Sequence, residues 1–117
     1  MRRAIEAVIV FGMLGATVAA EDRLRINVWP TISQAPAVVR VEVLLEPDDQ
    51  NRSLEIVVDS GEYYRSSVIQ LDGAGGARFH SVQYRSMPAG SYDVQVIIRG
   101  AGGARLAFDR RWVDVIS

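Results

Sequence analysis

The chain has 117 residues, enough for one domain but too few for two of ordinary size. Its 13 basic residues, all arginine, nearly balance 14 acidic ones, which disfavours nucleic-acid binding and electrostatic attachment to a membrane surface. Because the chain has no cysteine, its fold must depend on a hydrophobic core rather than on disulfides.

The first twenty residues have the pattern of a secretory signal peptide. A basic pair precedes an apolar run, and Val18 and Ala20 fit the small-residue positions of a signal-peptidase site. We therefore expect residues 1–20 to be removed and residues 21–117 to form a periplasmic or secreted domain without stable membrane insertion. The alternative is an uncleaved anchor, but the uncharged run after Glu6 is shorter than the roughly 20 residues of a spanning helix.

From Leu24 onward, apolar and polar residues alternate with the period of a β-strand, and no amphipathic helix of useful length is present. Proline, glycine and aspartate interrupt this alternation at intervals typical of tight turns. We predict seven strands, within 24–29, 35–47, 53–60, 66–71, 77–86, 91–100 and 105–116. The predicted fold class is therefore all-β, an antiparallel sandwich of about seven strands.

The last predicted strand does not alternate cleanly. Leu106 and Phe108 fall on one parity, whereas Val113 and Val115 fall on the other. A β-bulge near Asp109 to Arg111, which adds one residue to the strand, would place all four side chains on one face.

The segment MPAGSYDVQV, residues 87–96, has the pattern of a tight turn followed by a strand. Pro88 presets φ for a turn, and Gly90 can supply the positive φ that some turns require. The segment resembles the E–F corner and F strand of immunoglobulin-like and fibronectin type III-like domains, especially bacterial ones. This resemblance implies that Tyr92 buries its ring and bonds its hydroxyl to upstream backbone, as a tyrosine corner. Val94 stands where antibody domains have their second cysteine, so the resemblance is to the cysteine-free branch, which hosts many functions.

No set of catalytic or metal-binding residues is visible. His80 is the only histidine, and no nucleophile signature accompanies it. The acidic loop 46–53 lacks the ligand spacing of an EF-hand, and the glycine clusters 72–78 and 99–105 lack the setting of a P-loop, so all three are interpreted as turns. We predict no catalytic residue, no metal site and no cofactor, and we expect the protein not to be an enzyme.

Four aromatic residues are the candidate binding residues, Trp29, Tyr63, Tyr64 and Trp112, because exposed rings can anchor a protein or stack on a sugar. We expect an exported non-catalytic module that binds another envelope or extracellular protein or has a structural role. The alternative is a small carbohydrate-binding module that uses these rings. A hydrolase or metal enzyme is a third class, for which no acid, base and nucleophile are visible.

Overall fold

The computed structural model describes residues 23–117, and the predicted signal segment lies outside these residues. They form the strands β1 (Leu24–Trp29), β2 (Ile32–Gln34), β3 (Ala37–Leu45), β4 (Ser53–Asp59), β5 (Tyr64–Gln70), β6 (Phe79–Met87), β7 (Gly90–Arg99) and β8 (Arg105–Ile116). Two 3-10 turns, η1 (Gly73–Gly75) and η2 (Ala101–Gly103), connect strands. Within this described part, no helix is long and apolar enough to cross a membrane.

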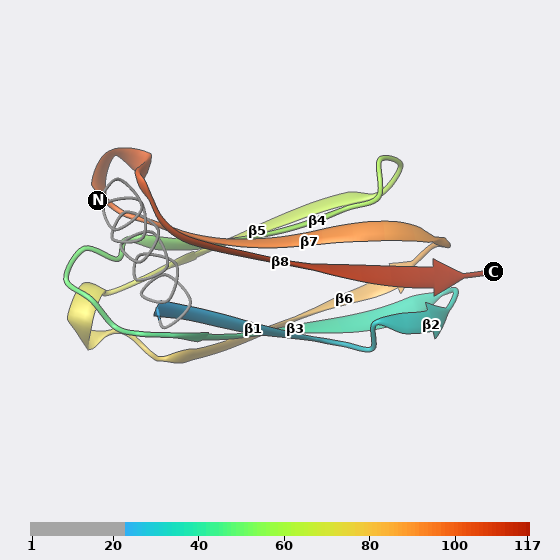
Figure 1. The fold of residues 1–117 in the computed structure, drawn as a ribbon, viewed down its shortest axis with the longest axis horizontal. Coiled ribbons are helices and arrows are strands. Elements are labelled where there is room, and N and C mark those ends of the chain that lie inside the picture. Colours follow the sequence, from blue (N-terminus) through green and yellow to red (C-terminus); the bar gives the residue numbers. More distant parts are fainter. Residues whose placement is uncertain (1–22) are drawn as a thin grey trace, which may run out of the picture.

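The strands form two sheets that face each other as the two layers of a sandwich (Figure 1). One sheet has the order β1-β3-β6, and the other has the order β2-β8-β7-β4-β5. All neighbouring strands are antiparallel except β2, which runs parallel to the end of β8. The predicted all-β sandwich is confirmed; seven of these strands match the predicted segments, and β2 is an addition.

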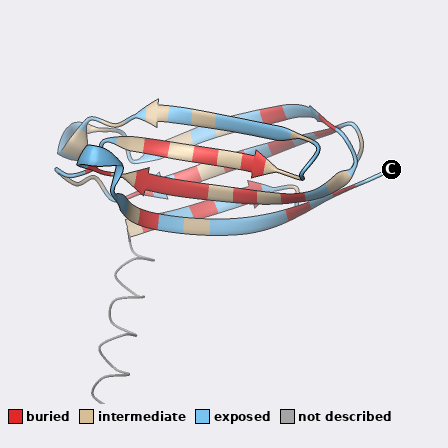
Figure 2. Ribbon diagram, turned by 90° about the horizontal axis from the view of Figure 1, so that it is seen from above, coloured by how far each residue is buried: buried red, intermediate tan, exposed pale blue. Residues whose placement is uncertain are grey.

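The core lies between the two sheets and is built from alternate residues of nearly every strand. β1, β3 and β4 show strict alternation of buried with more exposed positions, which Figure 2 shows as bands along the strands. The largest fully buried side chains are Tyr92, Leu54, Ile56, Met87 and Ile98. Period-two patterning therefore places one face of each sheet in the core and leaves the other to solvent.

The irregularity in β8 lies earlier than predicted. The register between β7 and β8 is unbroken from Gly90 to Ile98, and it shifts only between Ile98 and Arg99, which leaves Leu106 as the extra residue. Leu106 and Ala107 both pack against the core, and Phe108 is on the solvent side. The bulge is therefore next to the glycine-rich turn η2, where Gly102 and Gly103 have positive φ.

The turn before β7 is closed by the predicted tyrosine. Tyr92 is fully buried, and its hydroxyl donates a hydrogen bond of 2.6 Å to the carbonyl of Pro88. The positive φ in this turn belongs to Ser86, at 56°, and not to Gly90 as predicted. Gly90 instead allows a close approach, since a Cβ atom there would lie 3.3 Å from Cβ of Ser60.

Candidate functional site

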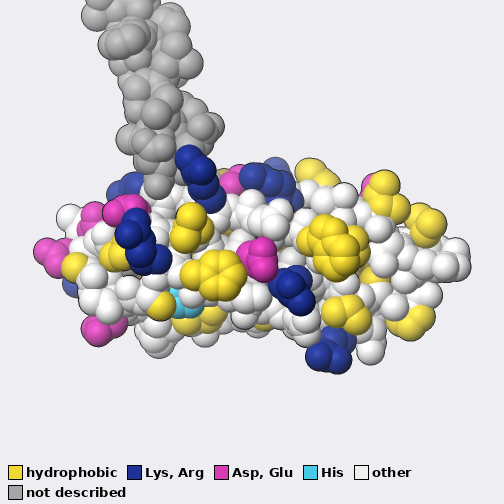
Figure 3. All heavy atoms as spheres, turned by 90° about the horizontal axis from the view of Figure 1, so that it is seen from below, with side chains coloured by type: hydrophobic (Ala, Val, Ile, Leu, Met, Phe, Trp, Pro, Cys, Tyr) yellow, Lys and Arg dark blue, Asp and Glu magenta, His cyan; other side chains and the backbone are white. Residues whose placement is uncertain are grey.

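The outer face of the three-stranded sheet contains a hollow of about 330 Å³ near the start of β1. This is the face seen in Figure 3, where hydrophobic side chains lie among arginines and acidic residues. Its volume is at the lower end of the range for small-molecule sites. The residues that line it are Arg25, Ile26, Asn27, Glu42, Leu44 and Phe79.

One wall of the hollow, which is mainly apolar, is formed by three residues that lie side by side across the three strands. Arg25 lies opposite Leu44, and Leu44 lies opposite Phe79, so these three side chains are neighbours on the same face. Leu44 and Phe79 are 50% and 55% exposed. Large apolar side chains at solvent-facing positions are therefore adjacent here rather than scattered.

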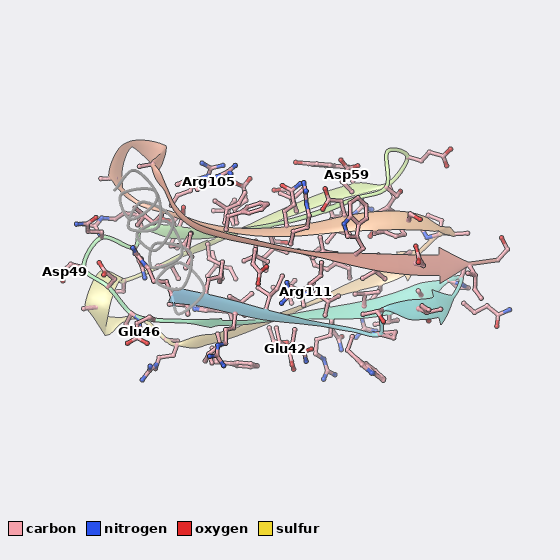
Figure 4. The ribbon with its side chains drawn as sticks, in the orientation of Figure 1. Glu42, Glu46, Asp49, Asp59, Arg105 and Arg111 are labelled. Carbon is pink, nitrogen blue, oxygen red and sulfur yellow. The ribbon has the colours of Figure 1, made fainter. Side chains whose placement is uncertain are left out.

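The polar wall comes from the next row. The side-chain amide of Asn27 donates a hydrogen bond of 3.2 Å to Oε1 of Glu42, and Arg40 lies 3.9 Å from the other carboxylate oxygen. Figure 4 shows Glu42 directed away from the sandwich. Within residues 23–117, Arg25 takes part in none of the ion pairs or side-chain hydrogen bonds. Its guanidinium is therefore available to donate hydrogen bonds to an acidic ligand.

The four predicted aromatic residues do not come together. Trp29 is 68% exposed on the three-stranded sheet, whereas Tyr64 and Trp112 are exposed on opposite edges of the other sheet. Tyr63 packs against the core, and its ring meets Tyr92 edge to face at 5.6 Å between centroids. These placements do not test the binding role of the four rings, which stays a prediction.

The outer face of the five-stranded sheet carries arginines that already have partners. Arg110 lies 3.0 Å from a carboxylate oxygen of Asp93, without hydrogen-bond geometry, and Arg99 pairs with Glu55 at 3.2 Å. The guanidinium of Arg105 is 4.9 Å from the ring centroid of Phe108, within cation–π distance. These three arginines are therefore each engaged with a partner, unlike Arg25.

The other candidates in the sequence have structural partners. A ring nitrogen of His80 lies 3.1 Å from the carbonyl oxygen of Ala77, and the backbone of the acidic loop is bonded by Asp48, whose carboxylate accepts from the N–H of Gln50. In residues 23–117, no three histidine, cysteine or acidic side chains gather in a way that could hold a metal ion.

Sequence reasoning missed the hollow, although part of its signal was present. Leu44 and Phe79 are apolar residues at solvent-facing positions of their strands, but they are 35 positions apart in the chain. Only the pairing of β3 with β6 makes them neighbours, and strand order and register are not visible in one sequence.

No family model matches the sequence, and a search of curated proteins finds no significant match. Solved structures do match. A superoxide reductase (neelaredoxin) from Ignicoccus hospitalis has a TM-score of 0.61 at 13% identity, with 80% of each chain covered. The sulfur carrier protein SoxY from Chlorobium limicola has a TM-score of 0.57 at 16% identity, with 89% of this chain and 96% of that chain covered. A family 76 glycoside hydrolase from Bacteroides thetaiotaomicron matches 80% of this chain with 20% of its own, at a TM-score of 0.54 and 15% identity.

These neighbours share a small β-sandwich with this chain, and at such identities they show the fold alone. They nevertheless correct one expectation. The prediction of a non-catalytic module for protein binding or a structural role, with a carbohydrate-binding alternative, rested on the lack of a visible catalytic set in the sequence, and the same fold occurs in proteins named as superoxide reductases. Because the sandwich accommodates enzymes as well as binding modules, it gives no ground for calling this chain non-catalytic.

Proposed function

We propose that the domain binds a small organic acid with an apolar body in the hollow on the outer face of the three-stranded sheet. The observation that carries this proposal is the position of Arg25 beside exposed Leu44 and Phe79, at the wall of a hollow large enough for a small molecule. An apolar surface with a few placed polar groups is the usual composition of a small-molecule site.

The two walls of the hollow would recognise different parts of the ligand. The guanidinium of Arg25 can bind a carboxylate through two parallel hydrogen bonds, while Leu44 and Phe79 cover the ligand's apolar body. Glu42, already hydrogen-bonded by Asn27, repels a second acidic group at the polar end. The geometry therefore favours monoacids over diacids.

A direct test is to titrate phenylacetate into isotopically labelled protein, expressed from the full-length sequence and purified, and to follow backbone amide shifts by NMR. We expect shifts concentrated at Arg25, Leu44 and Phe79, with weaker binding of phenylacetamide, which lacks the charge. Shifts of equal size for both compounds, or shifts spread over both sheets, would overturn the proposal.

Variants separate the two contributions. Arg25→Gln should weaken phenylacetate binding about tenfold, which corresponds to the loss of one charge-assisted interaction. Arg105→Gln is the matched control, because Arg105 is an exposed arginine beside an aromatic ring on the opposite face of the sandwich. We expect the control variant to bind as the wild type does.

We further propose that the chain belongs to the cysteine-free branch of immunoglobulin-like or fibronectin type III-like domains and is exported. The hydrogen bond from Tyr92 to Pro88 supports the first proposal, and the pattern of residues 1–20 supports the second. Mass spectrometry of protein expressed in a bacterial host tests export, since cleavage would leave Glu21 as the first residue.

A further inference from the structure

The outer edge of β1 has unused backbone hydrogen-bonding groups at alternate residues. The N–H of Glu46 donates to the carbonyl of Arg23, and the register continues this pairing along the strand. In an antiparallel pair both backbone groups of a residue point to the same side. Arg25, Asn27 and Trp29 therefore direct these groups toward β3, whereas Leu24, Ile26 and Val28 direct theirs away from it. None of the hydrogen bonds between described residues occupies these outward groups.

The open edge of β8 differs because its own side chains close it. A carboxylate oxygen of Asp109 accepts from the N–H of Arg110 at 2.8 Å, and the guanidinium of Arg111 donates to the carbonyl of Arg110 at 2.8 Å. Asp109 and Arg111 also pair with each other at 2.7 Å, and Figure 4 shows Arg111 between the two layers. Charged side chains of this kind prevent a further strand from pairing with an edge.

The edges of β5 and β6 are also less suited to a further strand. On β5, the guanidinium of Arg65 donates to the carbonyl of Tyr64 at 3.0 Å. On β6, the inward positions include half-buried His80, and Tyr84 crosses to Ser67 on β5. The inward-facing residues of β1 are all apolar. β1 therefore combines free backbone groups with an apolar inner face that an added strand would extend.

We propose that the chain forms a two-fold dimer in which β1 pairs antiparallel with β1 of a second copy, with the axis at Ile26. Ile26 then faces Ile26 of the second copy, and Leu24 faces Val28 on either side. Each of these pairs exchanges both of its N–H···O bonds, because all of them have outward-directed groups. The two three-stranded sheets join as one six-stranded sheet.

The outer face favours this register. Arg25 lies opposite Asn27 of the second copy, whose Oδ1 can accept from the guanidinium while its Nδ2 remains bonded to Glu42. Only the Asn27 side chain then separates the guanidinium of Arg25 from the Glu42 carboxylate of the second copy. The two-fold axis repeats this contact on the other side of Ile26. A guanidinium has five donors, so this contact leaves donors for an acid bound in the hollow.

Disulfide cross-linking tests the register, because the chain has no cysteine of its own. Directly opposed residues of the non-hydrogen-bonded type lie at a Cα separation that a disulfide spans. A mixture of Arg25→Cys and Asn27→Cys proteins, each expressed from the full-length sequence and distinguished by mass, should oxidise mainly to the mixed dimer. Predominant Asn27→Cys homodimers would overturn the register, and absence of cross-links would overturn the interface.

Sedimentation equilibrium of the wild type, without ligand, tests the dimer itself, and a monomer at every concentration would overturn the proposal. Asn27→Lys should raise the dimer dissociation constant roughly tenfold, because the new positive charge lies opposite Arg25 of the other copy at both symmetry-related positions. Adding Arg25→Glu to Asn27→Lys should restore the dimer, which a merely misfolded variant would not do. Ser81→Lys is the control, since Ser81 flanks Glu42 from the opposite edge strand and should leave the dimer unchanged.

Discussion

Tyr92 and Tyr84 are both buried, and each bonds through its hydroxyl, yet the two bonds connect very different parts of the chain. Tyr92 reaches the carbonyl of Pro88, four residues upstream in the same turn. Tyr84 on β6 meets the hydroxyl of Ser67 on β5 at 2.8 Å, across 17 positions and from one sheet to the other. The first bond holds a local turn, whereas the second holds the two layers together along one edge of the sandwich.

The same contrast explains what the sequence could predict. The turn that Tyr92 closes depends only on residues 87–96, so its motif can be recognised without any knowledge of tertiary structure. Strand positions likewise follow from the local alternation of apolar and polar residues. The bond between Tyr84 and Ser67, and the hollow at Arg25, depend on which strands become neighbours. Strand order and register result from the packing of the whole core, and a single sequence does not display them.

Removal of the Tyr92 hydroxyl should have the larger effect of the two. Tyr92→Phe leaves the Pro88 carbonyl without its partner, and we expect a loss of about 1–2 kcal/mol in the free energy of unfolding. Urea unfolding measures it, and Tyr64→Phe, on the solvent-facing side of β5, is the matched control. Unchanged stability of Tyr92→Phe would show that the hydroxyl does not hold the corner.

Removal of the Tyr84 hydroxyl should cost less, about 0.5–1.5 kcal/mol, because one side-chain hydrogen bond is lost and the Ser67 hydroxyl is partly accessible to water. Ser67→Ala should cost a similar amount. The double variant should be hardly less stable than either single variant, since both remove the same bond. Full additivity in urea unfolding would mean that the bond contributes nothing.

Alkaline pH should weaken the fold, and we expect this to be the smallest effect. Burial raises the pKa of both Tyr92 and Tyr84 above the ordinary phenol value. Above about pH 10 the unfolded chain therefore loses these protons before the folded chain does, and the free energy of unfolding falls as pH rises. Urea unfolding across this range should give a shallower decline for the Tyr84→Phe/Tyr92→Phe variant, and an identical decline would contradict the assignment.

The extra residue at Leu106 has a genetic consequence. Leu106 stands between Arg105, which pairs with Arg99, and Ala107, which pairs with Ile98. An in-frame loss of the Leu106 codon would therefore join two residues whose partners are already adjacent, and β8 would keep both of its faces. Loss of a codon farther along β8 would instead interchange the two faces of the strand on one side of the deletion, because side chains alternate with a period of two. Codon-deletion scanning should therefore find β8 most tolerant at Leu106.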